Sequence, residues 1–328
     1  MCTKVRASQE SPRNGSRPDV RQRVAILLGM VCGASTACGA AQTTPTPGSS
    51  AVVARVGASV ITQAAFDTRL KSTLTAIHQG GGPSGNAAME AQVRAAVVRS
   101  LILDTIIAQE AQSRGIAATS RDVQSQIDAD AKSVGGLSTL ESQLASAGGS
   151  LAQLQDEVRS QINEERLENI FAQQRAQEVE QRLAAGEAFA TVAQEMSDDS
   201  GTNAKGGDLG ALSASDLTTY DPAFAAAVKA LAPAQYTTTP VRDAGGYDII
   251  QLYAIGSNGQ GQQTWSVRHI LVAAPVPYTV SNRPAWFGEA LFATVAQLCT
   301  TGKVRVYLKD AGADPCKGAP VLTPSPAP

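Results

Sequence analysis

Aromatic side chains, histidines and long apolar runs are all scarce in this sequence of 328 residues. Aromatics make up 4% of the chain while Ala is abundant, which favours Ala-rich helices over a β-sandwich. No apolar run reaches the roughly 18 residues that a membrane-spanning helix requires. With only His78 and His269, and without CxxC or HExxH spacing, the chain is not expected to hold zinc or a Ser/His/Asp triad.

The charge balance excludes a second class of partner. The chain has 27 basic and 29 acidic residues, a formal net charge of −2, and no long basic stripe. Nucleic acid is therefore not expected as its main partner. Hydrophobic residues make up 43% of the chain, which is enough for one or two packed cores.

The first fifty residues have the composition of a targeting segment. A basic stretch precedes the apolar run Val24–Ala34, which has the length of a signal-peptide core. The sequence Ser35-Thr-Ala-Cys38 then resembles a bacterial lipobox, although Ser35 stands where Leu is usual. We predict a signal peptide over 1–37, lipidation of Cys38 and a Thr/Pro/Ser tether over 38–50. The alternative is an ordinary signal peptide cleaved at a nearby Ala.

The remaining cysteines agree with export. Cys2 and Cys32 lie in the segment that would be removed, which leaves Cys299 and Cys316 near the C-terminus. In an oxidising compartment, a bridge between them would contribute about 3 kcal/mol. We favour this disulfide over two unpaired thiols in a flexible tail.

Residues 51–175 have the pattern of a mostly helical domain entered by a strand. Residues 51–62 alternate around a Gly-Ala pair, which is typical of a short hairpin or bent strand. Thr62 and Thr119 are placed as helix N-caps, and Gly115 as a residue that ends a helix. The helices are expected over 63–79, 87–114, from Thr119, over 138–147 and over 150–177.

This order of elements resembles the N-terminal chaperone domain of the SurA/PrsA foldases. The resemblance rests on the entry strand, the helix that follows Ile61-Thr62, and the long helix containing LILDTIIAQEAQSRGIAAT. It implies an extracytoplasmic protein, often anchored by lipid, that binds unfolded exported chains.

The segment that follows resembles the parvulin family of peptidyl-prolyl isomerases. The shared features are Leu183…Gly186-Glu-Ala-Phe189, Ser197-Asp198-Asp199, Lys205-Gly-Gly-Asp-Leu-Gly210, a helix with Phe224, then Pro233 and the strand Gly246–Leu252. Taken alone, GGDLG could be a phosphate-cradling loop. It lacks the preceding buried strand and the Lys-Ser/Thr pair that such loops carry.

One parvulin strand is out of its usual order. The family begins with a strand similar to "RHILV", and here Arg268-His-Ile-Leu-Val272 follows the last parvulin strand. A hairpin through 256–263 would pair it with 246–252, and this indicates a circularly permuted parvulin. The rival interpretation is a truncated domain followed by the first strand of a degenerate second copy.

The resemblance implies a site as well as a fold. His269, Asp199 and Asp248 are the implied catalytic residues, with Asp248 standing where many relatives have a second His. A carboxylate beside the imidazole should favour its charged form. The implied apolar cup for the substrate proline ring is Leu209, Leu217 and Phe224. No cofactor or metal is implied.

The chain after the isomerase region is expected to return to the N-terminal domain. Residues 285–298 have a helical pattern, and 303–308 alternate as a strand that could pair with Val52–Val56. The fold class is thus α+β, a mostly helical chaperone domain plus a parvulin-like antiparallel sheet flanked by helices. The predicted parts are 1–37, 38–50, 51–175, 176–273 with its first strand from 265–272, and 274–328.

The sequence therefore predicts an extracytoplasmic foldase of the bacterial cell envelope. It would isomerise X–Pro bonds in exported proteins, bind unfolded chains and attach to the membrane through Cys38. Two alternatives remain open. One is a chaperone with a catalytically inactive parvulin module, and the other is a structural envelope lipoprotein.

Overall fold

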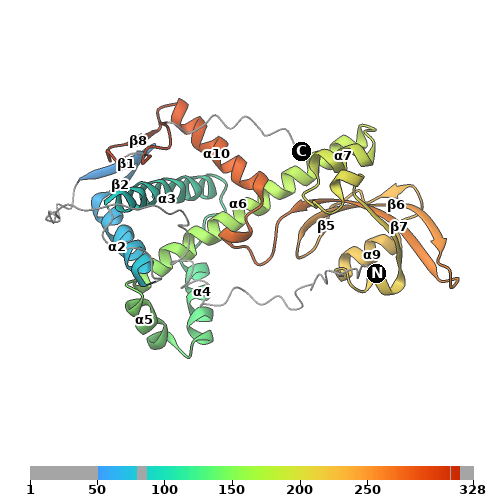
Figure 1. Cartoon of the computed structure of the whole chain (residues 1–328), viewed down its shortest axis with the longest axis horizontal. Coiled ribbons are helices and arrows are strands. Elements are labelled where there is room, and N and C mark those ends of the chain that lie inside the picture. Colours follow the sequence, from blue (N-terminus) through green and yellow to red (C-terminus); the bar gives the residue numbers. More distant parts are fainter. Residues whose placement is uncertain (1–50, 80–86, 311, 318–328) are drawn as a thin grey trace, which may run out of the picture.

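A computed structural model describes residues 51–79, 87–310 and 312–317. The predicted signal peptide, the tether and Cys38 lie outside these residues. Helices dominate one part of the molecule and an antiparallel sheet the other, so the α+β prediction is confirmed (Figure 1). In the described ranges no helix is both long and apolar enough to cross a bilayer.

The helical part begins with a small sheet. Strands β1 (Val52–Val56) and β2 (Ser59–Thr62) form the predicted hairpin, and β8 (Val304–Val306) completes the order β2-β1-β8. Helix α2 (Gln63–Gln79) starts where the Thr62 hydroxyl accepts the Ala65 backbone N–H. The inner face of the sheet packs on α2 and on α3 (Ala87–Ser113), in a core that includes Phe66.

Two short helices and one very long helix follow. The capping box of Thr119 and Asp122 opens α4 (Ser120–Ser133), as the sequence predicts. Helix α5 (Leu137–Ser146) comes next, and Ser150 then caps α6 (Leu151–Ala184). Helix α6 continues past the predicted end at residue 177, because no helix-breaking residue occurs before Gly186.

Helix α6 belongs to both parts of the molecule. Its first half packs against α3 and α4, whereas Ala172, Ala176, Val179 and Leu183 lie in the core of the large sheet. Its 34 residues span about 50 Å, so it crosses most of the molecule (Figure 1). The predicted boundary at 175/176 therefore falls inside one continuous helix.

The large sheet has the order β3-β7-β6-β4, with β5 also on β6. The chain enters it through α7 (Phe189–Met196) and the short 3₁₀ helix Asn203–Lys205. The remaining elements are β3 (Asp208–Ser213), α8 (Ala214–Leu217), α9 (Pro222–Ala230), β4 (Gln235–Tyr236), β5 (Val241–Arg242), β6 (Gly246–Ser257) and β7 (Gln263–Ala273). Strands β6 and β7 form the predicted hairpin, with Ile249 opposite Ile270.

The C-terminal region returns to the helical part, as predicted. After the 3₁₀ turn Val280–Asn282, helix α10 (Ala285–Thr300) packs Phe287 and Leu291 against α3 and α6. Strand β8 then pairs antiparallel with β1. Cys299 and Cys316 are disulfide-bonded, with their Cα atoms 5.4 Å apart.

A buried ionic contact ties this return to α6. The Tyr278 hydroxyl and the Arg283 guanidinium both donate to the Glu164 carboxylate, which is 4% exposed. Breaking one partner of such a contact would leave a buried charge without compensation. The contact therefore fixes the segment that leaves β7 against the centre of the long helix.

Candidate active site

His269 lies between two carboxylates. Its Nδ1 is 2.7 Å from Asp248 Oδ1 on the neighbouring strand β6, and its Nε2 is 2.8 Å from Asp199 Oδ2 in the loop after α7. His269 is 8% exposed and Asp248 is 2% exposed. The structure therefore brings together all three residues predicted to be catalytic, and β7 lies where the hairpin prediction requires.

The loop that carries Asp199 is fastened to β7. The Asp198 backbone N–H donates to Leu271 O (2.8 Å), and the Asp198 side chain accepts the Ala273 N–H (2.8 Å). Ser197 Oγ accepts the Leu271 N–H at 3.1 Å. These bonds continue the pairing along the edge of β7 beyond β3. They explain why Ser197 and Asp198 precede Asp199, the residue that reaches the imidazole.

A glycine permits a close approach further along the same edge of β7, where β3 begins. The His269 N–H donates to Gly207 O at 2.9 Å. Gly207 has a φ of +77°, and a Cβ on it would lie 2.1 Å from the His269 carbonyl oxygen. Only glycine fits this position, because both the backbone conformation and the space exclude a side chain.

The carboxylates control the charge of the imidazole. Burial alone would lower the pKa of His269, but hydrogen bonds with Asp199 and Asp248 outweigh it and raise this pKa to about 9. The hydrogen bond with His269 also holds the pKa of Asp199 well below its usual value. Burial raises the pKa of Asp248 to about 6 despite the neighbouring cation. The raised pKa of His269 and the lowered pKa of Asp199 both favour the charged imidazole, which is the direction expected for an imidazole beside carboxylates.

The predicted apolar cup is only partly at the surface. Leu217 and Phe224 are 1% and 2% exposed and belong to the core between α9 and the sheet, whereas Leu209 is half-buried. The Phe224 ring stands edge-on to His269 with centroids 6.1 Å apart. Leu217 and Phe224 thus support the site from below and offer almost no surface to a ligand.

Sequence reasoning missed two residues of the site. Tyr220 is half-buried and stacks on Phe224 with ring centroids 4.8 Å apart, so it presents the aromatic surface that was predicted for Phe224. Its pKa is raised, first by burial and then by Asp216, Asp199 and Asp248. The Thr202 hydroxyl donates to Asp199 Oδ2 and lies 3.2 Å from His269 Nε2. The turn sequence Asp199-Ser-Gly-Thr202 could have indicated this contact.

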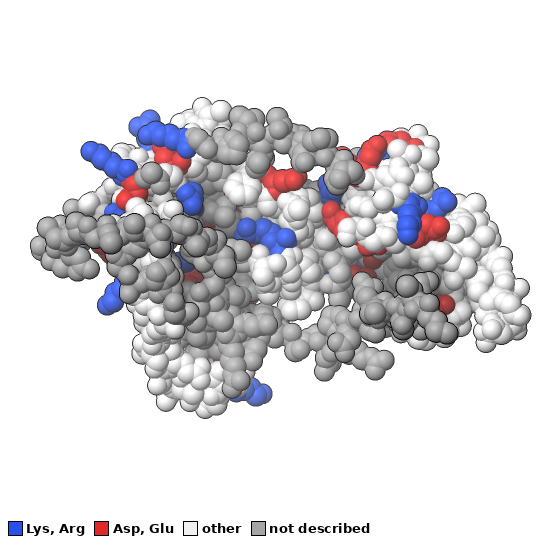
Figure 2. Space-filling model, viewed as in Figure 1, with Lys and Arg blue, Asp and Glu red and all other residues white. Residues whose placement is uncertain are grey.

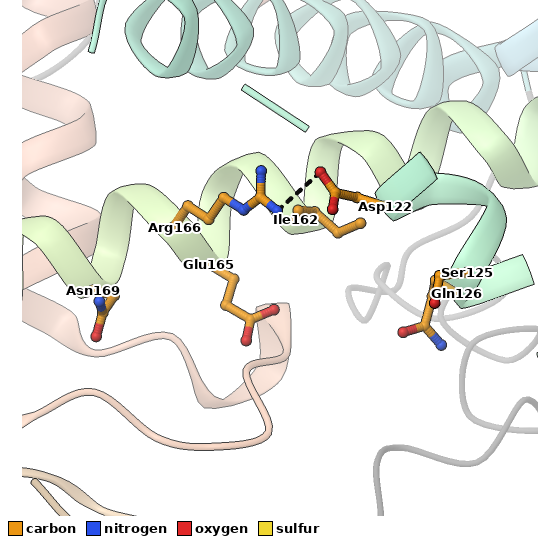
Figure 3. Close-up of a pocket in the computed structure, with 7 residues that line it drawn as sticks. All are labelled: Asp122, Ser125, Gln126, Ile162, Glu165, Arg166 and Asn169. Atoms are coloured by element: carbon orange, nitrogen blue, oxygen red, sulfur yellow. Dashed lines mark ion pairs between the residues drawn. The ribbon is translucent and has the colours of Figure 1, made fainter. Parts of the chain in front are cut away.

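A separate cavity lies between α4 and α6 (Figure 3). Its volume is about 360 Å³, and its lining includes the ion pair of Asp122 with Arg166. The lining contains one apolar side chain, Ile162, and it shares no residue with the His269 site. A polar cavity of this kind does not provide the apolar surface expected for a proline ring.

Two family models match the two parts of the chain. Residues 20–168 match the SurA-like N-terminal domain, and residues 161–254 match the PPIC-type PPIASE domain. The second match ends before β7, in agreement with the strand order described above. The predicted resemblance to parvulin foldases of the SurA/PrsA type is confirmed.

Individual relatives match over a shorter stretch. Over 77 residues, 24% of this chain, the identity is 44% to chaperone SurA of Chromohalobacter salexigens and 46% to foldase protein PrsA of Clostridium botulinum. These stretches span 17% and 22% of the two relatives. The solved structure of PrsA from Lactococcus lactis aligns over 79% of this chain and 95% of its own, at 12% identity and a TM-score of 0.30.

Proposed function

We propose that this chain, whose two parts match the SurA-like N-terminal and PPIC-type PPIASE families, is an extracytoplasmic foldase. It isomerises X–Pro peptide bonds in exported proteins and binds their unfolded chains. The observation that carries this proposal is the placement of His269 between Asp199 and Asp248, with the Phe224 ring edge-on to it and the half-buried Tyr220 stacked on Phe224.

The reaction makes modest chemical demands. Rotation about an X–Pro bond crosses a barrier of roughly 20 kcal/mol, because the amide loses its planarity. An enzyme lowers the barrier by binding the twisted amide more tightly than either planar form. An apolar surface for the ring and partial removal of water from the carbonyl serve this purpose without a cofactor.

Described residues support the first of these features, the apolar surface. Tyr220 and Leu209 form the accessible apolar surface, and Phe224 holds Tyr220 in place from below. The imidazolium of His269 cannot turn, because both of its nitrogens are engaged. The imidazolium places a fixed positive charge next to this surface. Asp199 and Thr202 lie at Nε2, on the more exposed side of the His269 ring.

Isomerase activity on a proline peptide tests the catalytic part. We expect the chain to accelerate cis–trans exchange of an Ala-Pro peptide, and His269→Ala to lower kcat/KM at least tenfold with the fold retained. His78→Ala, on the exposed end of α2, is the matched control and should leave activity unchanged. Full isomerase activity in His269→Ala would show that the His269 site does not catalyse the reaction.

The chaperone part has its own assay. Suppression of aggregation of an unfolded client should survive His269→Ala, because binding of unfolded chains is assigned to the helical part. If wild-type protein suppresses aggregation but does not isomerise the peptide, the chain is a chaperone with an inactive parvulin module. If it does neither, the structural lipoprotein is the better reading.

Location and anchoring complete the proposal. The apolar run Val24–Ala34 and the lipobox-like Ser35–Cys38 support export to the cell envelope and lipidation of Cys38. In high salt, which screens contacts between charged side chains and lipid headgroups, Cys38→Ser should release the protein from membranes into the soluble extracytoplasmic fraction. Unchanged partitioning of this variant in high salt would rule out the lipid anchor.

A further inference from the structure

The outer face of the small sheet β2-β1-β8 carries an unusual set of side chains. Residues 303–309 alternate strictly, so that Val304, Val306 and Leu308 pack into the core. The alternate residues point outward, because side chains along an extended chain alternate between faces. These exposed residues are Lys303, Arg305, Tyr307 and Lys309.

Strand β1 adds a fourth cation to this face. Arg55 is exposed and lies directly opposite Arg305 in the antiparallel β1–β8 pair, and Val60 of β2 lies opposite Arg55 on its other side. Directly opposed residues project from the same face, and like charges in such positions are destabilising. The small sheet thus bears an unfavourable contact that its core does not require.

No acidic side chain of the described residues forms an ion pair with these four cations. Residues 51–66 and 290–309 contain no Asp or Glu, and no ion pair of Arg55, Lys303, Arg305 or Lys309 occurs in the ranges that the structure describes. The nearest acidic residue in sequence, Asp310, is paired with Arg94 at 3.2 Å. Figure 2 shows Lys and Arg side chains over β1 and β8, with some Asp or Glu side chains beside them.

We propose that this basic face, defined by Arg55, Lys303, Arg305, Tyr307 and Lys309, binds the surface of an anionic lipid bilayer. Its cations lie on β1, on β8 and on the residues that flank β8, and this spread suits a broad negative surface better than a single anion. Tyr307 and Val60 are 50% and 42% exposed, and Tyr is a side chain that settles at bilayer interfaces.

The position of the face in the chain favours a membrane over other acidic partners. Strand β1 begins at Val52, directly after the Thr/Pro/Ser stretch 38–50. A linker of this length and composition would have a root-mean-square span of about 20 Å if it behaved as a random coil. If Cys38 carries lipid, the face therefore stays within reach of the bilayer at a high effective concentration.

Binding through this face would orient the whole molecule. The large sheet lies at the opposite end of α6 from β1 and β8 (Figure 1). With the basic face on the lipid, α6 would hold the His269 site tens of ångströms from the bilayer. Exported chains could then reach the site without competition from the membrane surface.

Vesicle binding by the full chain with Cys38→Ser tests the proposal, because no acyl chain then contributes. We expect binding to vesicles of phosphatidylglycerol and phosphatidylcholine, weakening as salt rises, and little binding to phosphatidylcholine alone. Arg55→Glu in this background should weaken partitioning roughly 30-fold, since two unit charges change near the surface. Arg121→Glu on α4, an exposed residue with the same charge change, is the control.

Stability provides an independent readout. Arg55→Glu replaces an Arg–Arg contact by a Glu–Arg contact, so its Tm should equal or exceed that of the parent while vesicle binding falls. Equal partitioning of Arg55→Glu and Arg121→Glu would overturn the proposal. A lower Tm in Arg55→Glu than in the parent would also overturn it. Binding to polyglutamate without binding to anionic vesicles would overturn it as well, and would make an acidic polypeptide the partner.

Discussion

The two sheets of this protein are each completed by a strand that follows the rest of the sheet in sequence, but the two strands occupy different positions. Strand β7 has β3 on one side and β6 on the other, whereas β8 pairs only with β1 at the edge of its sheet. A central strand supplies hydrogen bonds and apolar side chains to two neighbours. The large sheet therefore depends on its late strand far more than the small sheet does.

The same two sheets treat charge in opposite ways. The large sheet buries His269 with two carboxylates, so opposite charges are matched at short range. In the small sheet Arg55 and Arg305 are exposed and directly opposite in register, and neither forms an ion pair with another described residue. In the large sheet, the buried charges fix the position of the His269 ring. In the small sheet, the exposed charges are available to a binding partner.

The largest expected effect is the loss of β7. A chain ending at Gly261 lacks this strand, which would expose the backbone of β6 and the apolar side chains Ile249 and Leu252. We expect its isomerase module to lose cooperative unfolding, as measured by near-ultraviolet circular dichroism during heating. A chain ending at Gly302, which lacks β8, should keep the cooperative transition of that module.

A chain ending at Pro275 is the control for the first truncation, because it retains β7 and lacks the same C-terminal helix. If the chains ending at Gly261 and Pro275 melt cooperatively at the same temperature, β7 does not complete the sheet. In that case His269 could not be assigned to the active site.

Two glycines at positive φ give the next largest difference between the sheets. Gly207→Ala would place a Cβ 2.1 Å from His269 O, whereas at Gly57, in the β1–β2 turn, no atom lies within 4 Å of the added Cβ. We expect Gly57→Ala to cost about 1 kcal/mol from backbone conformation alone. Gly207→Ala should cost more than about 3 kcal/mol, because strain is added to a backbone clash. Urea unfolding of both variants measures the difference, and equal costs would contradict the close packing of Gly207 on β7.

Much of the fold could be predicted because its signals are local. The Thr119–Asp122 capping box, Gly115 after α3 and the alternation of β8 are each encoded within a few residues. The β6–β7 hairpin was implied by the resemblance to parvulins together with the Gly-rich loop between the two strands. The pairing of His269 with Asp248 was likewise implied by the resemblance and depended on that hairpin.

The rest of the site depends on contacts that no local pattern reveals. Stacking of Tyr220 on Phe224, and the resulting burial of Phe224, depend on how α9 lies on the sheet. The contact of Glu164 with Tyr278 and Arg283 joins residues more than a hundred positions apart. The boundary between the two parts could not be predicted either, because it lies within the continuous helix α6, where no Pro-, Gly- or Ser-rich linker occurs.

The disulfide should affect only one of the two sheets. Cys299 lies at the end of α10 beside β8, and the bridge closes a loop over a sequence separation of 17. Cys299→Ala with Cys316→Ala should lower the free energy of unfolding of the helical part by about 3 kcal/mol. Isomerase activity of the double variant should be unchanged. A clear fall in the isomerase kcat/KM of the double variant would show that the two sheets are coupled through α6.

The smallest expected effect is a change in one proton affinity at the buried site. The His269 pKa of about 9 lies above the ordinary value of 6.5, so its contribution to stability is complete below pH 6.5 and is lost as pH rises through 9. Asp248→Asn removes one of the two carboxylates and should lower the His269 pKa by one unit or more, as read from the imidazole C–H resonance during an NMR titration. Asp208→Asn is the matched control, since the Asp208 carboxylate accepts from the Tyr253 hydroxyl instead (3.0 Å), and it should change the His269 pKa by less than about 0.3. Equal shifts in the two variants would mean that the general negative charge of the sheet, and not the 2.7 Å contact with Asp248, keeps the imidazole protonated.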